Sequence, residues 1–187
     1  MRQNGNGIPF TERNQYARMC IAKALISILE HKSMEDITIT SLVKVANVSR
    51  MTFYKYYASK QEVLADYMYE IVHAYMEDAA RRGDIGKFRE QKHICHCFTF
   101  FKQYSHTIMT LVKANMYSVI INAINDYMDY YVLSSKDYSK YELYYYAGAL
   151  CNTYIKWIEG GMAETAEEIS TVVYKHINRG KEKETSV

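Results

Sequence analysis

Residues 38–64 read TITSLVKVANVSRMTFYKYYASKQEVL, and this stretch decides the fold class. Thr38 is a good N-cap for a short helix that ends near Ala46, because its side-chain oxygen can accept a hydrogen bond from a free amide in the first turn. Asn47 tolerates the left-handed conformation that closes a tight turn. Ser49 can then cap a second short helix. Two short helices joined by such a turn are typical of a helix-turn-helix.

Apolar and polar residues alternate within this stretch with helical spacing. The residues expected to build its small core are Leu42, Val43, Ala46, Val48, Phe53 and Tyr57. The residues expected to face outward lie between them and are Arg50, Met51, Thr52, Tyr54, Lys55 and Tyr56. Arg reads guanine edges, while Thr, Tyr and Lys reach bases or phosphates. The pattern therefore predicts a DNA-reading surface on the second short helix.

The remainder of the chain predicts long helices. The 187 residues contain one proline and eight glycines, which are too few turn-forming residues to connect many short strands. Helical periodicity or flanking breaks predict helices over 11–30, 59–80, 88–104, 107–113, 117–132, 139–159 and 165–177. We therefore expect an all-α fold of about nine helices. A three-helix DNA-binding head would occupy residues 1–60, and a helical body would occupy residues 61–187.

Charge is divided unevenly between these two parts. Residues 1–60 contain nine Lys or Arg and four Asp or Glu, whereas residues 61–187 contain fourteen and seventeen. A basic head suits contact with phosphates. No apolar run approaches the roughly 20 residues that cross a bilayer, and nothing resembles a signal peptide. The four cysteines form no paired framework. We expect a cytoplasmic protein without a membrane partner.

The stretch from Thr38 to Leu64 closely resembles the tetracycline-repressor (TetR) family. It contains a Thr-capped second helix, a turn ending in Val48-Ser49, an aromatic-rich recognition helix and a Ser-Lys-Gln-Glu opening to the fourth helix at residues 59–62. These four pieces stand in the family's order and spacing. The resemblance implies a transcriptional repressor that binds double-stranded operator DNA as a homodimer and is released by a small-molecule effector.

The resemblance also implies which residues contact DNA. Four of them would lie at the floor or edge of the major groove, three would meet backbone and base edges further along, and two at helix N-termini would hold phosphates. In that order, they are Ser49, Arg50, Met51 and Thr52, then Tyr54, Lys55 and Tyr56, then Thr38 and Lys60. Met51 stands where the family often has a small residue, and its side chain offers apolar contact to a thymine methyl.

In this family the body carries the effector site and the dimer interface. The resemblance implies that the last two helices, around residues 144–162 and 165–177, pair with those of a second subunit. Aromatic and Met side chains of the middle helices suit a largely apolar pocket. The candidate lining residues are Phe98, Phe101, Tyr104, Met109, Met116, Ile120, Tyr127, Tyr145 and Trp157. The same side chains at helical spacing would equally form a plain core.

Other functions remain open at this point. Cys95 and Cys97 with the nearby His93 and His96 could form a metal or redox sensor, although inert thiols and packed histidines are commoner. The same head could also belong to an activator, or to a regulator whose body binds a partner protein instead of a small molecule. No Gly-rich phosphate loop, nucleophile elbow or carboxylate pair indicates an enzyme. We expect no catalytic residue, no cofactor and no bound metal.

Overall fold

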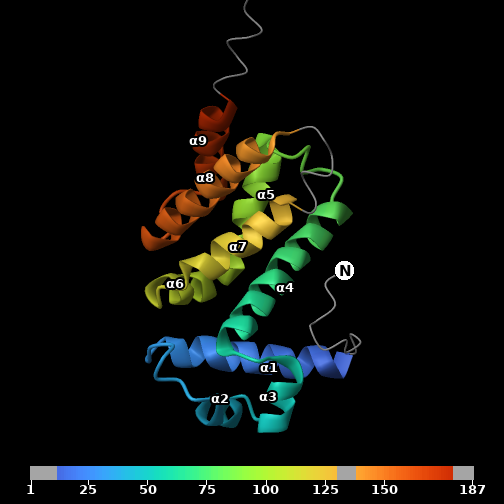
Figure 1. The fold of residues 1–187 in the computed structure, drawn as a ribbon. Coiled ribbons are helices and arrows are strands. Elements are labelled where there is room, and N and C mark those ends of the chain that lie inside the picture. The colour runs from blue at the N-terminus through green and yellow to red at the C-terminus, as the bar shows by residue number, and fades with distance from the viewer. Residues whose placement is uncertain (1–11, 130–137, 179–187) are drawn as a thin grey trace, which may run out of the picture. The chain divides into compact units, whose positions relative to one another are not determined.

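A computed structural model describes residues 12–129 and 138–178. These residues form helices and no strand, so the expected all-α fold of about nine helices is confirmed. Figure 1 labels the elements in chain order. They are α1 (Glu12–Leu29), α2 (Ile39–Val45), α3 (Arg50–Tyr56), α4 (Lys60–Arg81), α5 (Gln91–Phe101), the 3₁₀ helix η1 (Lys102–Tyr104), α6 (Ser105–Lys113), α7 (Tyr117–Tyr127), α8 (Lys140–Glu159) and α9 (Ala166–Asn178).

The chain divides into two compact units. The first, here called the head unit, contains the residues up to Glu70 together with Thr110–Val119. The second, the body unit, contains Ile71–Met109 and the residues from Ile120 onward. Helix α4 supplies residues to both units. The domain boundary expected between residues 60 and 61 stays a prediction.

The caps expected for the two short helices are confirmed. The Thr38 side chain accepts from the Ser41 amide at 3.1 Å, and the Ser49 side chain accepts from the Thr52 amide at 2.9 Å. Asn47 has φ 53°, the left-handed conformation that the tight turn requires. The sequence therefore forms a helix-turn-helix, and α1 packs on both α2 and α3 (Figure 1).

The core of the head unit follows the expected alternation. Leu42, Val43, Ala46, Phe53 and Tyr57 are buried, and so are apolar side chains of the flanking helices α1 and α4. The flanking buried residues include Ile21, Leu25, Leu29, Val63 and Leu64. Val48 is half-buried. Burying a Phe or Leu side chain contributes about 1.5–3 kcal/mol to folding, so this small core holds α2 and α3 in place.

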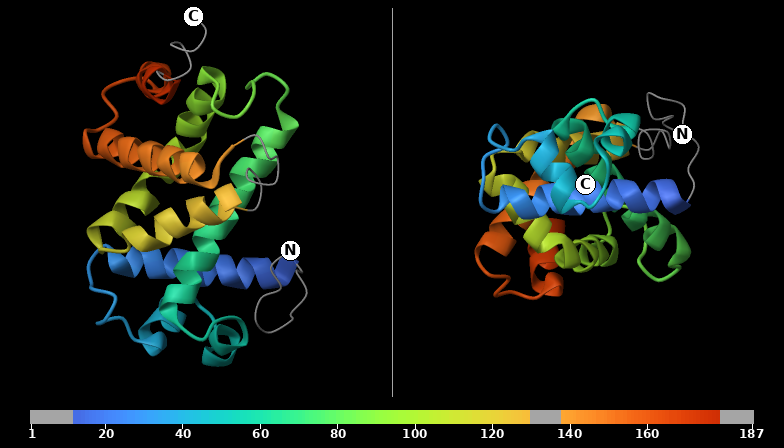
Figure 2. Two further views of the ribbon diagram at one scale, coloured as in Figure 1. Left: turned by 45° about the horizontal axis from the view of Figure 1, so that its top comes forward. Right: turned by 90° about the horizontal axis from the view of Figure 1, so that it is seen from below.

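Packing in the body unit centres on α5. Helix α9 packs mainly on α5 and less on α8, and α8 and α9 cross steeply in the left view of Figure 2. A hydrogen bond from Gln91 Nε2 to Thr171 Oγ1 of 2.8 Å joins α5 to α9. Helix α8 begins with a capping box between Ser139 and Glu142, at the start predicted from the sequence.

Two expected helix boundaries in the body unit are wrong. The helix predicted from residue 88 begins at Gln91, because Gly86 (φ 75°) and Arg89 (φ 71°) adopt left-handed backbone that a helix excludes. The predicted break at Ser105-His106 does not occur, since η1 leads directly into α6 at Ser105. The end of the helix predicted over 117–132 and the break at residues 134–137 lie outside the described residues.

Candidate nucleic-acid interface

The surface of α3 that the sequence predicts to read DNA has a strongly exposed edge. Met51 is 84% exposed and Tyr54 50% exposed, and Arg50 and Lys55 are exposed as well. Residues three and four apart lie on one helix face, so Met51, Tyr54 and Lys55 form a single stripe. Thr52 and Tyr56 are half-buried, while Phe53 points into the core. Four of the six residues expected to face outward are thus exposed.

Small hydroxyl side chains at the two helix starts are used within the chain. Ser49 Oγ lies 2.8 Å from Thr52 Oγ1 and also accepts from the Thr52 amide. At the start of α2, Thr38 Oγ1 donates to Ser41 Oγ at 3.1 Å. A hydroxyl has one donor and two acceptor positions. These pairs therefore reduce what the hydroxyls can offer to DNA and hold the first turns of both helices.

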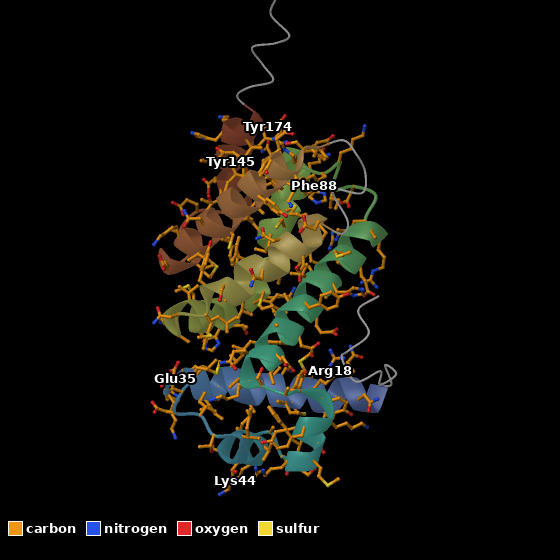
Figure 3. The ribbon with its side chains drawn as sticks, in the orientation of Figure 1. Arg18, Glu35, Lys44, Phe88, Tyr145 and Tyr174 are labelled. Atoms are coloured by element: carbon orange, nitrogen blue, oxygen red, sulfur yellow. The ribbon has the colours of Figure 1, made fainter. Side chains whose placement is uncertain are left out.

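Two residues expected at the DNA surface are anchored inward by their side chains. Tyr56 donates its hydroxyl to Asn14 Oδ1 at 2.6 Å, which links the end of α3 to α1. Lys60 Nζ donates to the main-chain carbonyls of Met34 and Ile37. These two carbonyls take two of the three ammonium protons of Lys60, so its main-chain amide at the start of α4 is a second group that could meet a phosphate. The basic Lys44 lies on the outer side of α2 (Figure 3).

A partly buried ion-pair network that sequence reasoning missed joins α1, α4 and the end of α3. The Arg18 guanidinium donates to both carboxylate oxygens of Asp66, with Nε 2.9 Å from Oδ2, and Nη2 also reaches Glu70 Oε1 at 3.2 Å. Tyr57 donates its hydroxyl to Asp66 Oδ2 at 2.6 Å. Asp66 and Glu70 are four residues apart on one face of α4. Figure 3 labels Arg18 on α1.

This network fixes the end of the recognition helix. Tyr57 follows α3 directly as its C-cap residue, and its ring is buried. Burial, and then the charge of Asp66, raise the pKa of the Tyr57 phenol, so the hydroxyl stays a neutral donor. The only sequence signal for this network is the spacing of Asp66 and Glu70, because nothing in a single sequence places Arg18 opposite them.

The residues expected to line an effector pocket are mostly interior. Phe98, Ile120 and Trp157 are buried, and five others are half-buried, namely Phe101, Tyr104, Met109, Met116 and Tyr127. Tyr145 requires a correction, because it is 69% exposed and its side chain does not line the interior. Helix α8 turns Leu143, Tyr146 and Ala147 inward, which leaves Tyr145 on the opposite side. The pocket itself stays a prediction.

Aromatic rings form a continuous cluster in the body unit. Tyr75 of α4 has ring centroids within 5.4 Å of Phe100 and 5.2 Å of Phe101, and Tyr127 lies at 6.3 Å. Phe98 meets Trp157 at 5.6 Å. Tyr75 was not among the expected lining residues, although it lies at the centre of this cluster. Several expected lining residues are thus brought together around it.

The His and Cys residues of α5 do not assemble a metal site. His93 Nε2 lies 2.9 Å from the Tyr75 hydroxyl, and His96 Nε2 lies 3.1 Å from Asp78 Oδ2. Burial raises the pKa of the Cys97 thiol to about 12, so this thiol stays protonated at neutral pH. Among the described residues no group of three His, Cys, Asp or Glu could hold a metal ion. The metal-sensor hypothesis thus lacks a ligand set there.

The last two helices expose apolar side chains. On α8, Tyr141 is 80% exposed and Tyr145 is 69% exposed, and on α9 Val172 is 53% exposed. Figure 3 labels Tyr145 and Tyr174 on these helices. Neither these helices nor any other helix in the described part of the chain is long and apolar enough to cross a membrane.

Comparison with known proteins decides the family. A family model described as "Transcriptional regulator C-terminal region" (TetR_C_8) matches residues 88–179, which form most of the body unit. The chain belongs to the TetR family of transcriptional regulators. The match lies outside the helix-turn-helix, so two separate regions of this TetR-family chain indicate the same family. A comparison with curated proteins gives no match.

Solved structures share the fold of this regulator. A TetR transcriptional regulator from Streptococcus agalactiae 2603V superposes with a TM-score of 0.61 at 20% identity, over 88% of this chain and 95% of that one. The dihydroxyacetone kinase operon activator DhaS gives 0.55 at 16% identity, over 88% and 95%. The repressor FadR from Thermus thermophilus, solved in complex with lauroyl-CoA, gives 0.53 at 18% identity, over 86% and 92%.

Proposed function

We propose that this TetR-family regulator is a repressor that binds operator DNA as a homodimer through α3 and is released by a small-molecule ligand. The observation that carries the proposal is the division of α3 into two faces. Phe53 and the following Tyr57 are buried, whereas Arg50, Met51, Tyr54 and Lys55 are exposed on a helix held by caps at both ends. A recognition helix needs this combination of a fixed position and an available surface.

Charge supports the contact with DNA. Residues 1–60 have a net charge of +5, and Lys44, Arg50 and Lys55 are exposed around the helix-turn-helix. Phosphate contacts from such side chains supply most of the sequence-independent affinity and make it depend on salt. Base contacts then supply the specificity.

Dimerisation follows from the symmetry of operators. A helix-turn-helix reads one half-site, and two half-sites about 34–36 Å apart require two recognition helices. The exposed Tyr141 and Tyr145 of α8 and Val172 of α9 support an isologous interface on the last two helices. Burying these large apolar side chains against a second copy would stabilise the dimer.

The ligand step rests on α4 and the aromatic cluster. Helix α4 supplies Tyr75 to the cluster and Asp66 to the network that fixes α3. A ligand that prefers one arrangement of α4 would change the spacing of the two recognition helices and weaken DNA binding by differential affinity. The neighbour FadR from Thermus thermophilus binds lauroyl-CoA, which supports an apolar or amphipathic ligand as the first class to screen.

An activator is the second candidate. The neighbour DhaS is named an operon activator, and its fold matches this chain about as well as that of the FadR repressor does. The sign of regulation depends on where the operator lies relative to the promoter, so α3 would serve either role. A reporter gene placed behind the operator distinguishes the two, because deletion of a repressor raises expression and deletion of an activator lowers it.

The direct test is a fluorescence-anisotropy titration of the full chain against the intergenic DNA upstream of its own gene, at several salt concentrations. We expect tight, competitor-resistant binding at two protomers or a multiple of two per site, and a log–log salt slope of several units. Binding no tighter than to random duplex, for this DNA and for a selected random library, would contradict the proposal. A bound operator then provides the assay in which candidate ligands release the protein.

A further inference from the structure

The most exposed large apolar side chain in the described residues is that of Met51, at the second position of the recognition helix. An exposed Met by itself is ordinary on a protein surface. Met51, however, lies on a face with Tyr54 and Lys55, beside Arg50, where the proposed function places the base pairs. Its apolar group is therefore offered to the DNA and not to the protein core.

The other side chains at the start of α3 are less able to read hydrogen-bonding groups. Ser49 and Thr52 pair with each other at 2.8 Å, and Ser49 also caps the helix. One of their two hydroxyl protons is thus used between them. Thr52 is also half-buried. The first turn therefore presents one charged group, Arg50, and one apolar group, Met51, as its fully exposed side chains.

An apolar side chain in the major groove has one specific partner. The C5 methyl of thymine is the only apolar group among the base edges there, because the other positions carry hydrogen-bond donors or acceptors. Tyr54 and Lys55 end in a hydroxyl and an ammonium group, so Met51 is the side chain of this stripe with no polar end. From this chemistry and from the exposure of Met51, we infer that the protein reads thymine by contact between Met51 and the thymine methyl in each operator half-site.

This inference rests on the proposed function and adds the class of DNA sequence that the site selects. It requires that the selected half-sites contain a thymine at a fixed position. It further requires that the methyl group, rather than the hydrogen-bonding edge of that base pair, contributes to affinity. Replacing thymidine by deoxyuridine distinguishes these two contributions to affinity, because deoxyuridine lacks the methyl group and keeps the hydrogen-bonding edge.

The experiment uses the full chain and duplexes selected by it from a random library. Each thymine of a selected duplex is replaced in turn by deoxyuridine, and affinity is measured by fluorescence anisotropy at fixed salt. We expect one position per half-site at which loss of the methyl weakens binding about fourfold, the value for one buried methyl-sized group. Replacement in both half-sites would weaken binding about fifteenfold if the two contributions add.

Protein variants assign the methyl effect to Met51. Met51→Gln keeps the length of the side chain but makes its end polar, so the thymine and deoxyuridine duplexes should bind it equally. Met51→Leu keeps an apolar side chain, so this variant should still bind the thymine duplex more tightly than the deoxyuridine duplex. Lys55→Ala is the matched control on the same face, and it should weaken both duplexes by the same factor. Met51 is exposed, so these variants should fold like the parent protein.

Three outcomes would overturn the inference. If no position is sensitive to the methyl while tight binding persists, the proposed function stands and the methyl reading is wrong. If Met51→Gln remains as sensitive to the methyl as the parent, another side chain makes the contact. If no duplex is enriched from the library, the proposed function itself fails and this inference fails with it.

Discussion

Arg18 of the head unit and Arg89 of the body unit are held in different ways. In the head unit, Arg18 donates to two carboxylates, and Asp66 also accepts from Tyr57. In the body unit, the Arg89 guanidinium lies 5.6 Å from the ring centroids of both Tyr138 and Tyr146. Its Nη2 donates to the Ile177 carbonyl at 3.4 Å, while its Nε has no hydrogen-bond partner among the described residues.

This difference suits the two proposed roles. Charged hydrogen bonds are short and directional, so the network around Asp66 favours one position of α3. Aromatic ring contacts are weaker, at about 0.5–1.5 kcal/mol per pair beyond the area that they bury. Under the proposed function, the aromatic cluster around Tyr75 is the part that would rearrange when a ligand binds.

The largest expected effect comes from breaking the head network. Asp66→Asn removes one of the two carboxylate charges that Arg18 faces and should lower the free energy of unfolding by about 2 kcal/mol, because charged hydrogen bonds from Arg18 are lost while Glu70 remains. Denaturant titration at fixed protomer concentration measures this change. Lys156→Ala is the control, since its ion pair with Glu159 is on the surface and should be worth less than about 0.5 kcal/mol. Equal effects of the two variants would show that the head network does not stabilise the fold.

The next effect concerns the exposed face of α3. Tyr54→Ala and Lys55→Ala should each weaken operator binding about tenfold and leave dimerisation and thermal stability nearly unchanged. The Lys55 variant should also reduce the log–log salt slope by about one unit, because it loses one phosphate contact. Anisotropy and thermal melting test both statements. A variant that unfolded or became monomeric would show that these side chains do not belong to the DNA face.

A smaller effect isolates the link between α3 and α4. Tyr57→Phe keeps the buried ring but removes the hydrogen bond to Asp66, and should cost about 1 kcal/mol of stability. Tyr154→Phe is the matched control in the body unit, where the lost hydrogen bond to the Phe101 carbonyl is 2.7 Å long. Both variants should lose similar stability in denaturant titrations. Only Tyr57→Phe should also lower the ratio of operator affinity to random-duplex affinity, and an unchanged ratio would argue against a positioning role.

The smallest effect at neutral pH concerns the two histidines of α5. Burial lowers the pKa of His93 and of His96 below the ordinary value of 6.5. Above that value both are neutral in the folded and unfolded chain, so they do not change stability. As the pH falls below it, the unfolded chain binds protons that the folded chain does not, and stability decreases until the pH passes the folded pKa values.

Denaturation midpoints between about pH 7.5 and pH 5 measure this loss. A double variant, His93→Gln with His96→Gln, should show a smaller decrease than the parent protein over the same range. If the two proteins lost stability in parallel, carboxylates or other groups would account for the acid sensitivity of the body unit.

Local patterns made the head predictable. The caps at Thr38 and Ser49, the left-handed Asn47 and the inward Phe53 each depend on residues within a few positions along the chain, and the structure has all of them. Local patterns gave a wrong helix start near Arg89, because Arg is a residue type that rarely adopts the positive φ found there. They also failed at Ser105, where a polar pair lies within continuous helical backbone.

The sequence by itself determined the all-α class, the helix-turn-helix and the family, because helix periods, caps and turns are short-range properties. Only the tertiary structure decided that Arg18 meets Asp66, that Lys60 turns to main-chain carbonyls and that Tyr145 faces outward. These outcomes depend on which helix faces meet across tens of residues. A single sequence records the composition of each face but not its partner, and burial and electrostatics act only once the faces are in contact.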